Sequence, residues 1–205
     1  MEANLLFSGG KDSSLSAFIL KKLGYEVKTI TITFGYSENW RLAKETSENL
    51  GYAHRVMRMD ERILKEGSRI TLEDGYPSKG IKYIHREVIE ELAKDYKVIC
   101  DGSRRDDRTP KLEFNEIRSL EDRYGVEYIS PLQGIGYKTL RYLANKLFII
   151  ETYNSSEKKT ADYETEARIF LGDRAENIFP AHEHTRVLGW RGDAEWQEIS
   201  HSVKN

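Results

Sequence analysis

The stretch "ANLLFSGGKDSSLSAFIL" (residues 3–20) decides the fold, because it joins a strand pattern to a helix pattern through a glycine-rich turn. Residues 4–7 form the short apolar run of a buried strand, and Leu15 and Phe18 recur at helical spacing. Two adjacent glycines let the backbone approach an anion closely, and the first amides of the following helix point at it. We therefore expect this corner to hold phosphate.

Strand and helix patterns alternate from this corner to about residue 150. The expected strands are residues 4–7, 27–34, 54–59, 97–101 and 127–129, and the expected helices are 12–23, 37–50, 61–72, 81–94, 113–124 and 138–147. Strands separated by helices require crossover connections. The pattern predicts an α/β fold with a doubly wound, mostly parallel five-stranded sheet. Ligands of such sheets bind at the carboxyl ends of the strands.

The chain changes character near residue 151, where polar residues replace the alternating pattern. We expect a nucleotide-binding domain over residues 1–150 and a C-terminal appendage over residues 151–205. The appendage should contain a helix at 162–171, which could be simply an exposed capped helix. A β-hairpin should follow, with its turn at Arg191–Asp193 and with Trp190 and Trp196 packed across it.

Two histidines of the appendage, His182 and His184, would share one face of a strand. One interpretation is a metal site, although no third ligand is evident in the sequence. Another is contact with RNA or substrate, together with Arg186 and Trp190. A third is a hairpin that covers the domain or makes a dimer contact.

The composition limits the partners that the chain can have. Its 32 Lys and Arg against 34 Asp and Glu give a net charge of -2, so any RNA contact needs a local basic patch. The single cysteine, Cys100, excludes an intramolecular disulfide, a four-cysteine zinc site and a self-contained iron–sulfur cluster. No apolar run of about 18 residues is present, which predicts a cytoplasmic protein without a membrane partner.

The loop at residues 8–14 does not match the two commonest phosphate loops. A Walker A loop that used Gly10 and Lys11 would need its first glycine at residue 5, which is Leu5, and a hydroxyl where Asp12 stands. The Gly-x-Gly-x-x-Gly spacing of a dinucleotide-binding loop is absent. A plain tight turn does not account for so many glycines, serines and a lysine at one corner.

The stretch "SGGKDS" (residues 8–13) resembles the Ser-Gly-Gly-x-Asp-Ser loop of the PP-loop ATP pyrophosphatases, N-type enzymes of the adenine nucleotide alpha hydrolase kind. That superfamily includes GMP, NAD and asparagine synthetases and the tRNA enzymes that make lysidine and thiolated bases. The resemblance covers about residues 3–150 and implies a HUP/Rossmann-like fold. It also implies that ATP is cut between its α and β phosphates, giving AMP and pyrophosphate.

A second block, "VICDGSRRDDRTP" (residues 98–110), follows a predicted strand. It resembles the Gly-His-x-x-Asp-Asp block of the tRNA-modifying branch, with Ser103 in place of the histidine. The resemblance implies that Asp106 and Asp107, with Asp12 of the first loop, bind Mg²⁺ beside the departing pyrophosphate. Alternatively, Asp12 stabilises a helix N-terminus, and the aspartate pair belongs to a solvated turn. The neighbouring arginines would pair with these aspartates or clamp phosphate: Arg104, Arg105 and Arg108.

Two further segments match the same branch. Lys82-Tyr83, in "SKGIKYIHREVIEELAK" (residues 78–94), stand where lysidine and thiouridine enzymes have Arg-Tyr, although Ile81, Ile84 and Val88 also have ordinary core spacing. Pro131-Leu132 match a Pro-Leu segment that precedes a helix. The resemblance assigns adenine to Ile32, Thr33 and Phe34. It assigns phosphate to Ser8, Gly9, Gly10, Ser13, Ser14, Gly102 and Lys138.

The implied chemistry is adenylation, with ATP and Mg²⁺ as cofactors and with Lys11, Asp12, Asp106 and Asp107 as catalytic residues. The expected acceptor is a tRNA base that is then substituted by sulfur or an amine. A small-molecule amide ligase and a non-catalytic adenine-nucleotide-binding protein are the alternatives. Because Cys100 ends an apolar strand, we expect it to be buried and inert, so that sulfur or ammonia comes from a donor. The expected partners are therefore tRNA, a sulfur or ammonia donor protein and a second copy of the chain.

Overall fold

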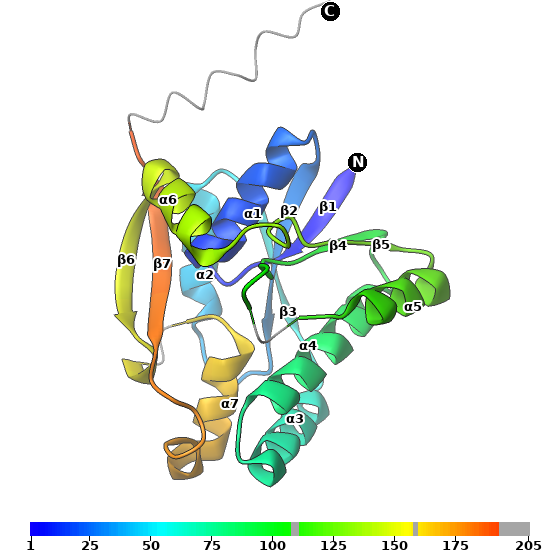
Figure 1. Cartoon of the computed structure of the whole chain (residues 1–205), viewed down its shortest axis with the longest axis vertical. Coiled ribbons are helices and arrows are strands. Elements are labelled where there is room, and N and C mark those ends of the chain that lie inside the picture. Colours follow the sequence, from blue (N-terminus) through cyan, green and yellow to red (C-terminus); the bar gives the residue numbers. More distant parts are fainter. Residues whose placement is uncertain (108–110, 158–159, 193–205) are drawn as a thin grey trace, which may run out of the picture.

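Five parallel strands form the centre of the computed structural model, which describes residues 1–107, 111–157 and 160–192 (Figure 1). Their order is β3-β2-β1-β4-β5, so the direction of winding reverses between β1 and β4. This confirms the predicted doubly wound α/β sheet and places its switch point after the first glycine-rich loop. The strands are β1 (Glu2–Leu6), β2 (Glu26–Thr33), β3 (Ala53–Arg58), β4 (Val98–Cys100) and β5 (Glu127–Ile129).

Helices cover both faces of this sheet. Leu5 and Leu6 of β1 belong to two different core clusters, because successive strand side chains point to opposite faces. The cluster around Leu5 includes side chains of α1 (Lys11–Lys22), α2 (Trp40–Asn49) and α6 (Tyr137–Leu147). The cluster around Leu6 includes side chains of α3 (Glu61–Asp74), α4 (Ser78–Leu92), α5 (Phe114–Tyr124) and α7 (Tyr163–Leu171).

Local sequence signals account for the bounds of several helices. The Asp60 carboxylate accepts the backbone N–H of Arg62 at 2.9 Å and begins α3. Gly75, at φ 69°, ends the same helix in the left-handed region, where a side chain would be strained. Glu113 and Glu116 form a capping box at the start of α5.

Helices α3 and α4 pack closely where Gly67 faces Gly80. A Cβ atom on Gly80 would overlap the Thr71 hydroxyl and the Gly67 carbonyl. We expect Gly80→Ala to lower the free energy of unfolding by about 1–3 kcal/mol, because backbone cannot move aside cheaply. Urea denaturation measures this. Gly134→Ala is the matched control, since its added Cβ would meet no atom within 4 Å; equal stability of the two variants would contradict the packing argument.

A second, antiparallel sheet pairs β6 (Phe148–Asn154) with β7 (Glu183–Trp190) beside α6 (Figure 1). The sequence predicted that the strand around His184 pairs across a turn at Arg191–Asp193. Strand β7 pairs with β6, which precedes α7 in the chain. The predicted partner strand beyond the turn lies outside the described residues, so the hairpin stays a prediction. Asp193 and Trp196 lie outside the described residues. Strand β6 also runs across the predicted domain boundary at residue 150, which stays a prediction.

The appendage packs on the sheet rather than apart from it. Helix α7 contacts α3 and α4, and β7 contacts α1 and α2. Two short 3-10 helices, η1 (Ser155–Glu157) and η2 (Gly172–Ala175), complete the described elements. Nowhere in the described ranges does a helix combine the length and the apolar character that a bilayer span requires.

Candidate active site

A cavity of about 290 Å³ lies at the carboxyl ends of β1, β2 and β4, at the switch point of the sheet. Its walls are the ends of β1 and β2, the loop before α1 and residues 101–107 after β4. The appendage closes it with residues 161–164 and with His184 of β7. Both motif blocks found in the sequence therefore meet at one cavity.

Glycines allow the two loops to meet. Gly9 has φ 79°, and a Cβ there would lie 3.2 Å from the Ala43 Cα of α2. Gly102, after β4, would bring a Cβ within 3.1 Å of the Ser13 backbone nitrogen. A larger residue at either position would push apart the backbone around the first turn of α1.

Strand β7 holds the glycine loop from the other side. The Val187 N–H donates to the Gly9 carbonyl at 2.9 Å, and the Lys11 N–H donates to Thr185 Oγ1 at 3.3 Å. The Thr46 hydroxyl of α2 donates to the Val187 carbonyl at 2.7 Å. Nothing in the sequence indicated these contacts, because they join residues more than 130 positions apart.

The structure brings some of the predicted residues to the cavity. The cavity-lining members of the predicted set are Ser8, Asp12, Ser13, Ile32, Gly102 and Asp107. Gly9, Gly10 and Lys11 lie at the same strand-to-helix corner without lining the cavity. Ser14 is fully buried in α1, and Lys138 is exposed on the first turn of α6. Neither of these last two side chains lines the cavity.

Asp106 does not join the other two aspartates. Its Oδ2 accepts the Tyr137 N–H at 2.8 Å, and its Oδ1 accepts from Arg105 Nε at 3.1 Å. The Asp106 side chain, which is 44% exposed, therefore binds the first backbone amide of α6. The hydrogen bond from Tyr137 and the bond from Arg105 lower the pKa of Asp106. Of the three predicted Mg²⁺ ligands, Asp12 and Asp107 line the cavity and Asp106 does not.

The end of β2 is only partly accessible to a ligand. Glu166 of α7 accepts the Thr33 hydroxyl at 2.6 Å and the Phe34 N–H at 2.7 Å. The predicted adenine contacts at Thr33 and Phe34 are therefore already occupied by this carboxylate. The last paired residues of β1 and β2 are Leu6 and Ile30. Ile32 stands two residues further along β2, so its backbone faces the same side as that of Ile30 but lies beyond the end of β1. Ile32 is the member of the predicted adenine set that lines the cavity.

Glu166 also shows that α7 is not the exposed capped helix that its polar sequence suggested. Thr165, Glu166 and Arg168 are all buried. The charged groups are satisfied internally, because Arg168 donates to the Phe179 and Pro180 carbonyls at 3.2 and 2.9 Å. Buried charges of this kind are found where each has a partner.

Charges of both signs meet at the mouth of the cavity. Arg104 Nε lies 2.6 Å from Asp107 Oδ1 and 3.6 Å from Asp12 Oδ2. Lys11 Nζ lies 3.0 Å from Asp12 Oδ1, but not in hydrogen-bonding geometry, since that oxygen has no hydrogen-bond partner. Two cations and two carboxylates are therefore arranged around the start of α1.

Several buried polar atoms at the cavity or next to it lack hydrogen-bond partners among the described residues. These atoms are Asp12 Oδ1, Arg104 Nη1 and His85 Nδ1. Buried polar atoms normally have hydrogen-bond partners, so unpaired ones at a cavity fit a bound polar ligand. The oxygens of Asp12 and Asp107 fit Mg²⁺, and the cations Lys11 and Arg104 fit a polyphosphate. The residues present thus fit ATP with Mg²⁺.

A buried network behind the cavity was not predicted. Asp101 accepts hydrogen bonds from Ser103 Oγ at 2.6 Å, Ser130 Oγ at 2.6 Å and Tyr128 OH at 2.7 Å. His85 Nε2 lies 3.0 Å from the same carboxylate, and His85 lines the cavity. Burial alone would raise the pKa of Asp101, but the hydrogen bond and charge of His85, with the serine hydroxyls, lower it to about 2.

The sequence contained a signal for this network. His85 stands four residues after Ile81, on the face of the helix that was predicted to be buried. Asp101 directly follows β4, at a strand end that faces ligands in this class of fold. Ser103, which replaces the family's histidine, donates both its N–H and its hydroxyl to Asp101.

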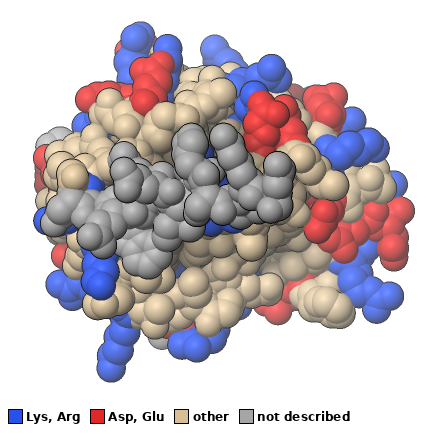
Figure 2. Space-filling view, turned by 90° about the horizontal axis from the view of Figure 1, so that it is seen from above, with Lys and Arg blue, Asp and Glu red and all other residues tan. Residues whose placement is uncertain are grey.

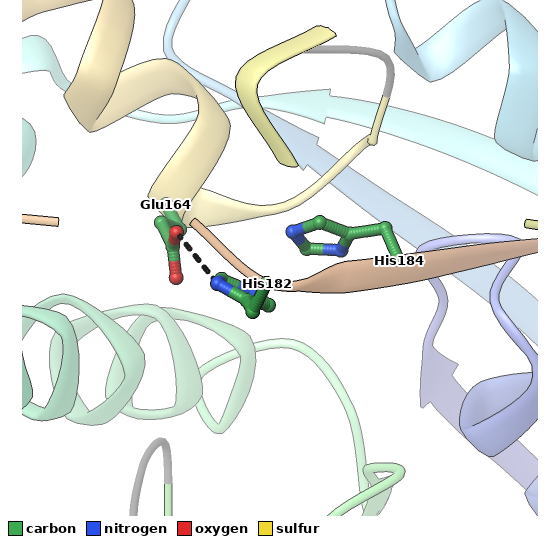
Figure 3. A group of neighbouring side chains, drawn as sticks. All are labelled: Glu164, His182 and His184. Carbon is green, nitrogen blue, oxygen red and sulfur yellow. Dashed lines mark ion pairs between the residues drawn. The ribbon is translucent and has the colours of Figure 1, made fainter. Parts of the chain in front are cut away.

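The two histidines of the appendage have the third neighbour that the sequence did not provide. Glu164, His182 and His184 place ligand atoms within 4.8 Å of one another (Figure 3). Burial lowers the pKa of His184, which favours its neutral form near pH 7.

Comparisons with known proteins identify the family of the chain. The family described as "Family of unknown function (DUF7411)" matches residues 1–189. The "Uncharacterized protein MJ0690" of Methanocaldococcus jannaschii is 50% identical over 192 residues, covering 92% of this chain and 96% of that protein. A crystal structure from Methanocaldococcus jannaschii, described as a "predicted subunit of tRNA methyltransferase", has 48% identity and a TM-score of 0.88. The match covers 93% of this chain and 98% of that one.

More distant similarity reaches enzymes of tRNA modification. The "tRNA-specific 2-thiouridylase MnmA 2" of Fusobacterium nucleatum is 29% identical over 126 residues. The match covers 60% of this chain but only 31% of the thiouridylase. This chain therefore spans about a third of that relative.

Proposed function

Because the chain belongs to the DUF7411 family and to the PP-loop ATP pyrophosphatase superfamily, we propose that it adenylates an acceptor oxygen with ATP and Mg²⁺. The observation that carries this proposal is the set of unpaired polar atoms around the "SGGKDS" corner, at the switch point of the sheet. A non-catalytic nucleotide-binding protein would not need the paired carboxylates Asp12 and Asp107 beside the phosphate-binding cations.

The proposed reaction is a displacement at the α-phosphorus. The acceptor oxygen forms a bond to the α-phosphorus, and the bond from that phosphorus to the bridging oxygen breaks. Pyrophosphate leaves with the electron pair, and the acceptor carbon becomes electrophilic. The helix N-terminus of α1, Lys11 and Arg104 stabilise the charge on pyrophosphate. Mg²⁺, held by Asp12 and Asp107, supplies further charge neutralisation when bound.

The acceptor that we propose is a tRNA base. The similarity to a tRNA-specific 2-thiouridylase supports it, as do the matches of residues 98–110 and of Lys82-Tyr83 to the tRNA-modifying branch. Figure 2 shows Lys and Arg side chains interspersed with Asp and Glu side chains, so the face seen there offers no continuous basic surface. Phosphate contacts would instead come from the exposed Arg105 and Lys138 near the start of α6.

The nucleoside content of tRNA tests this acceptor. Mass spectrometry of tRNA from cells that lack the gene should show the loss of one modified nucleoside, and the wild-type gene should restore it. The Asp12→Asn gene is the matched control and should fail to restore it. An unchanged nucleoside profile would contradict a tRNA acceptor and favour a small-molecule ligase.

The sulfur or amine that displaces AMP would come from outside the chain. Cys100 is fully buried, and burial raises the pKa of its thiol. We expect Cys100→Ala to keep its rate of AMP release and of base modification. Native protein should also resist a thiol reagent that labels the urea-unfolded chain. Loss of base modification in Cys100→Ala, with AMP release intact, would show that Cys100 carries the sulfur.

A further inference from the structure

Three metal-binding side chains converge at the rim of the nucleotide cavity. Glu164 comes from the first turn of α7, His184 from β7, and His182 from the residue before that strand. Figure 3 shows the carboxylate and the two imidazoles turned toward one another from these separate segments. Glu164 and His184 also line the cavity. The convergence is independent of the phosphate-binding loop, because none of the three belongs to it.

The backbone fixes this arrangement. His182 and His184 lie two residues apart on extended chain, so their rings project to one side, with centroids 4.5 Å apart. The His182 N–H donates to Ser155 Oγ at 3.1 Å, and the His182 carbonyl accepts the Ser155 N–H at 2.9 Å. These bonds hold the start of β7 against the end of β6.

Neighbouring groups leave metal-binding atoms available. His182 Nδ1 lies 3.1 Å from the Pro180 carbonyl, and His184 Nδ1 lies 3.7 Å from Asp162 Oδ2. The His182 contact is within hydrogen-bond distance, and in metal sites the second ring nitrogen of a histidine commonly bonds a carbonyl in this way, whereas the His184 contact is an ion-pair distance. The Glu164 contacts with Arg168, at 2.6 and 2.8 Å, and with His182, at 3.8 Å, all use Oε1. They leave Oε2 on the same carboxylate for an ion.

We propose that Glu164, His182 and His184 bind one divalent transition-metal ion, with Zn²⁺ as the representative. Two imidazoles and one carboxylate suit such an ion, whereas Mg²⁺ prefers oxygen ligands alone. Three protein ligands leave at least one coordination position for another molecule. Two of the ligands, Glu164 and His184, line the cavity, so a donor that enters the cavity would come close to the ion.

The open position gives the metal a role beside the nucleotide. It would take a sulfur, nitrogen or oxygen donor that enters the cavity, which on the proposed function is the nucleophile that displaces AMP. The metal site itself does not depend on that reaction. Its test therefore uses the full chain without ATP.

Titration of the metal-stripped full chain with Co²⁺ tests the site. We expect one equivalent to bind with visible absorption typical of four- or five-coordinate Co²⁺, and Zn²⁺ to displace it. His182→Ala and Glu164→Gln should each weaken Co²⁺ binding at least about tenfold. Glu183→Gln is the matched control, because Glu183 stands between the two histidines on the other face of the chain and is exposed.

Two outcomes would overturn the proposal. Wild-type Co²⁺ affinity in His182→Ala, with its urea midpoint unchanged, would show that these residues are not the ligands. Failure of a small thiol to add sulfur-to-cobalt absorption would show that no position is open to a donor. Neither result depends on AMP release, so a failed adenylation assay with intact Co²⁺ binding overturns the proposed function alone.

Discussion

Asp12→Asn is expected to lower the rate of AMP release from ATP by on the order of 10²–10³-fold, the usual cost of removing one group that stabilises transition-state charge. Asp12 stands on the first turn of α1, between Lys11 Nζ at 3.0 Å and Arg104 Nε at 3.6 Å. Its Oδ1 is buried without a hydrogen-bond partner. Replacing the carboxylate by a neutral amide would weaken a proposed oxygen ligand of Mg²⁺ and leave the protein cations uncompensated.

Single-turnover measurement of labelled AMP from ATP with saturating tRNA checks this expectation. Asp106→Asn is the matched control. Asp106 belongs to the same predicted set of carboxylates, but it accepts the Tyr137 N–H and does not line the cavity. It should keep nearly the wild-type rate and lose about 0.5–2 kcal/mol of stability, as a helix cap does. A larger loss of AMP release in Asp106→Asn than in Asp12→Asn would favour Asp106 as a Mg²⁺ ligand and contradict the structural placement.

Asp101→Ala is expected to lower the free energy of unfolding by about 3–5 kcal/mol, the cost of breaking a buried charged network. The buried hydroxyls of Ser103, Ser130 and Tyr128 would lose the carboxylate that accepts their hydrogen bonds. Urea denaturation at pH 7 measures the loss. Ser130→Ala, which removes one donor and keeps the carboxylate, should cost only about 1 kcal/mol.

The Asp101 carboxylate should also make the free energy of unfolding depend on pH in the acid range. The folded pKa of Asp101, about 2, lies below the ordinary aspartate pKa of 3.8, so the unfolded chain binds the proton more readily. Its contribution is fully present well above pH 3.8 and is lost as pH falls toward 2. Asp101→Asn should flatten the pH dependence in this window. An unchanged slope, with the fold intact by circular dichroism, would contradict an ionised Asp101.

The fold was predictable because its signals are local. A strand, a glycine turn and a helix follow one another within 18 residues, and a helix also follows each of the other four strands of the sheet. The bounds of α5 and of β5 agreed with prediction to within one residue, because a capping box and Gly125 mark them. Membership of the PP-loop superfamily rested on the same local motif and is confirmed.

The misplaced predictions depend on contacts between distant segments. Glu166 binds the end of β2 across 132 positions, so nothing near Phe34 in the sequence indicates that its amide is taken. Strand β6 follows α6 without a turn, and its partner β7 lies beyond α7 in the chain, so no local signal marked residues 148–154 as a strand. Asp106 and Asp107 are neighbours in sequence but point to different partners, which spacing alone cannot separate.

Release of labelled AMP from [α-³²P]ATP tests the central claim most directly. The full chain with Mg²⁺ should release AMP and pyrophosphate in equal amounts when tRNA lacking the modification and a sulfur or amine donor are present. It should release almost none when the tRNA is already modified. ADP as the product, or nucleotide binding without AMP release from any tRNA or small acceptor, would contradict the account.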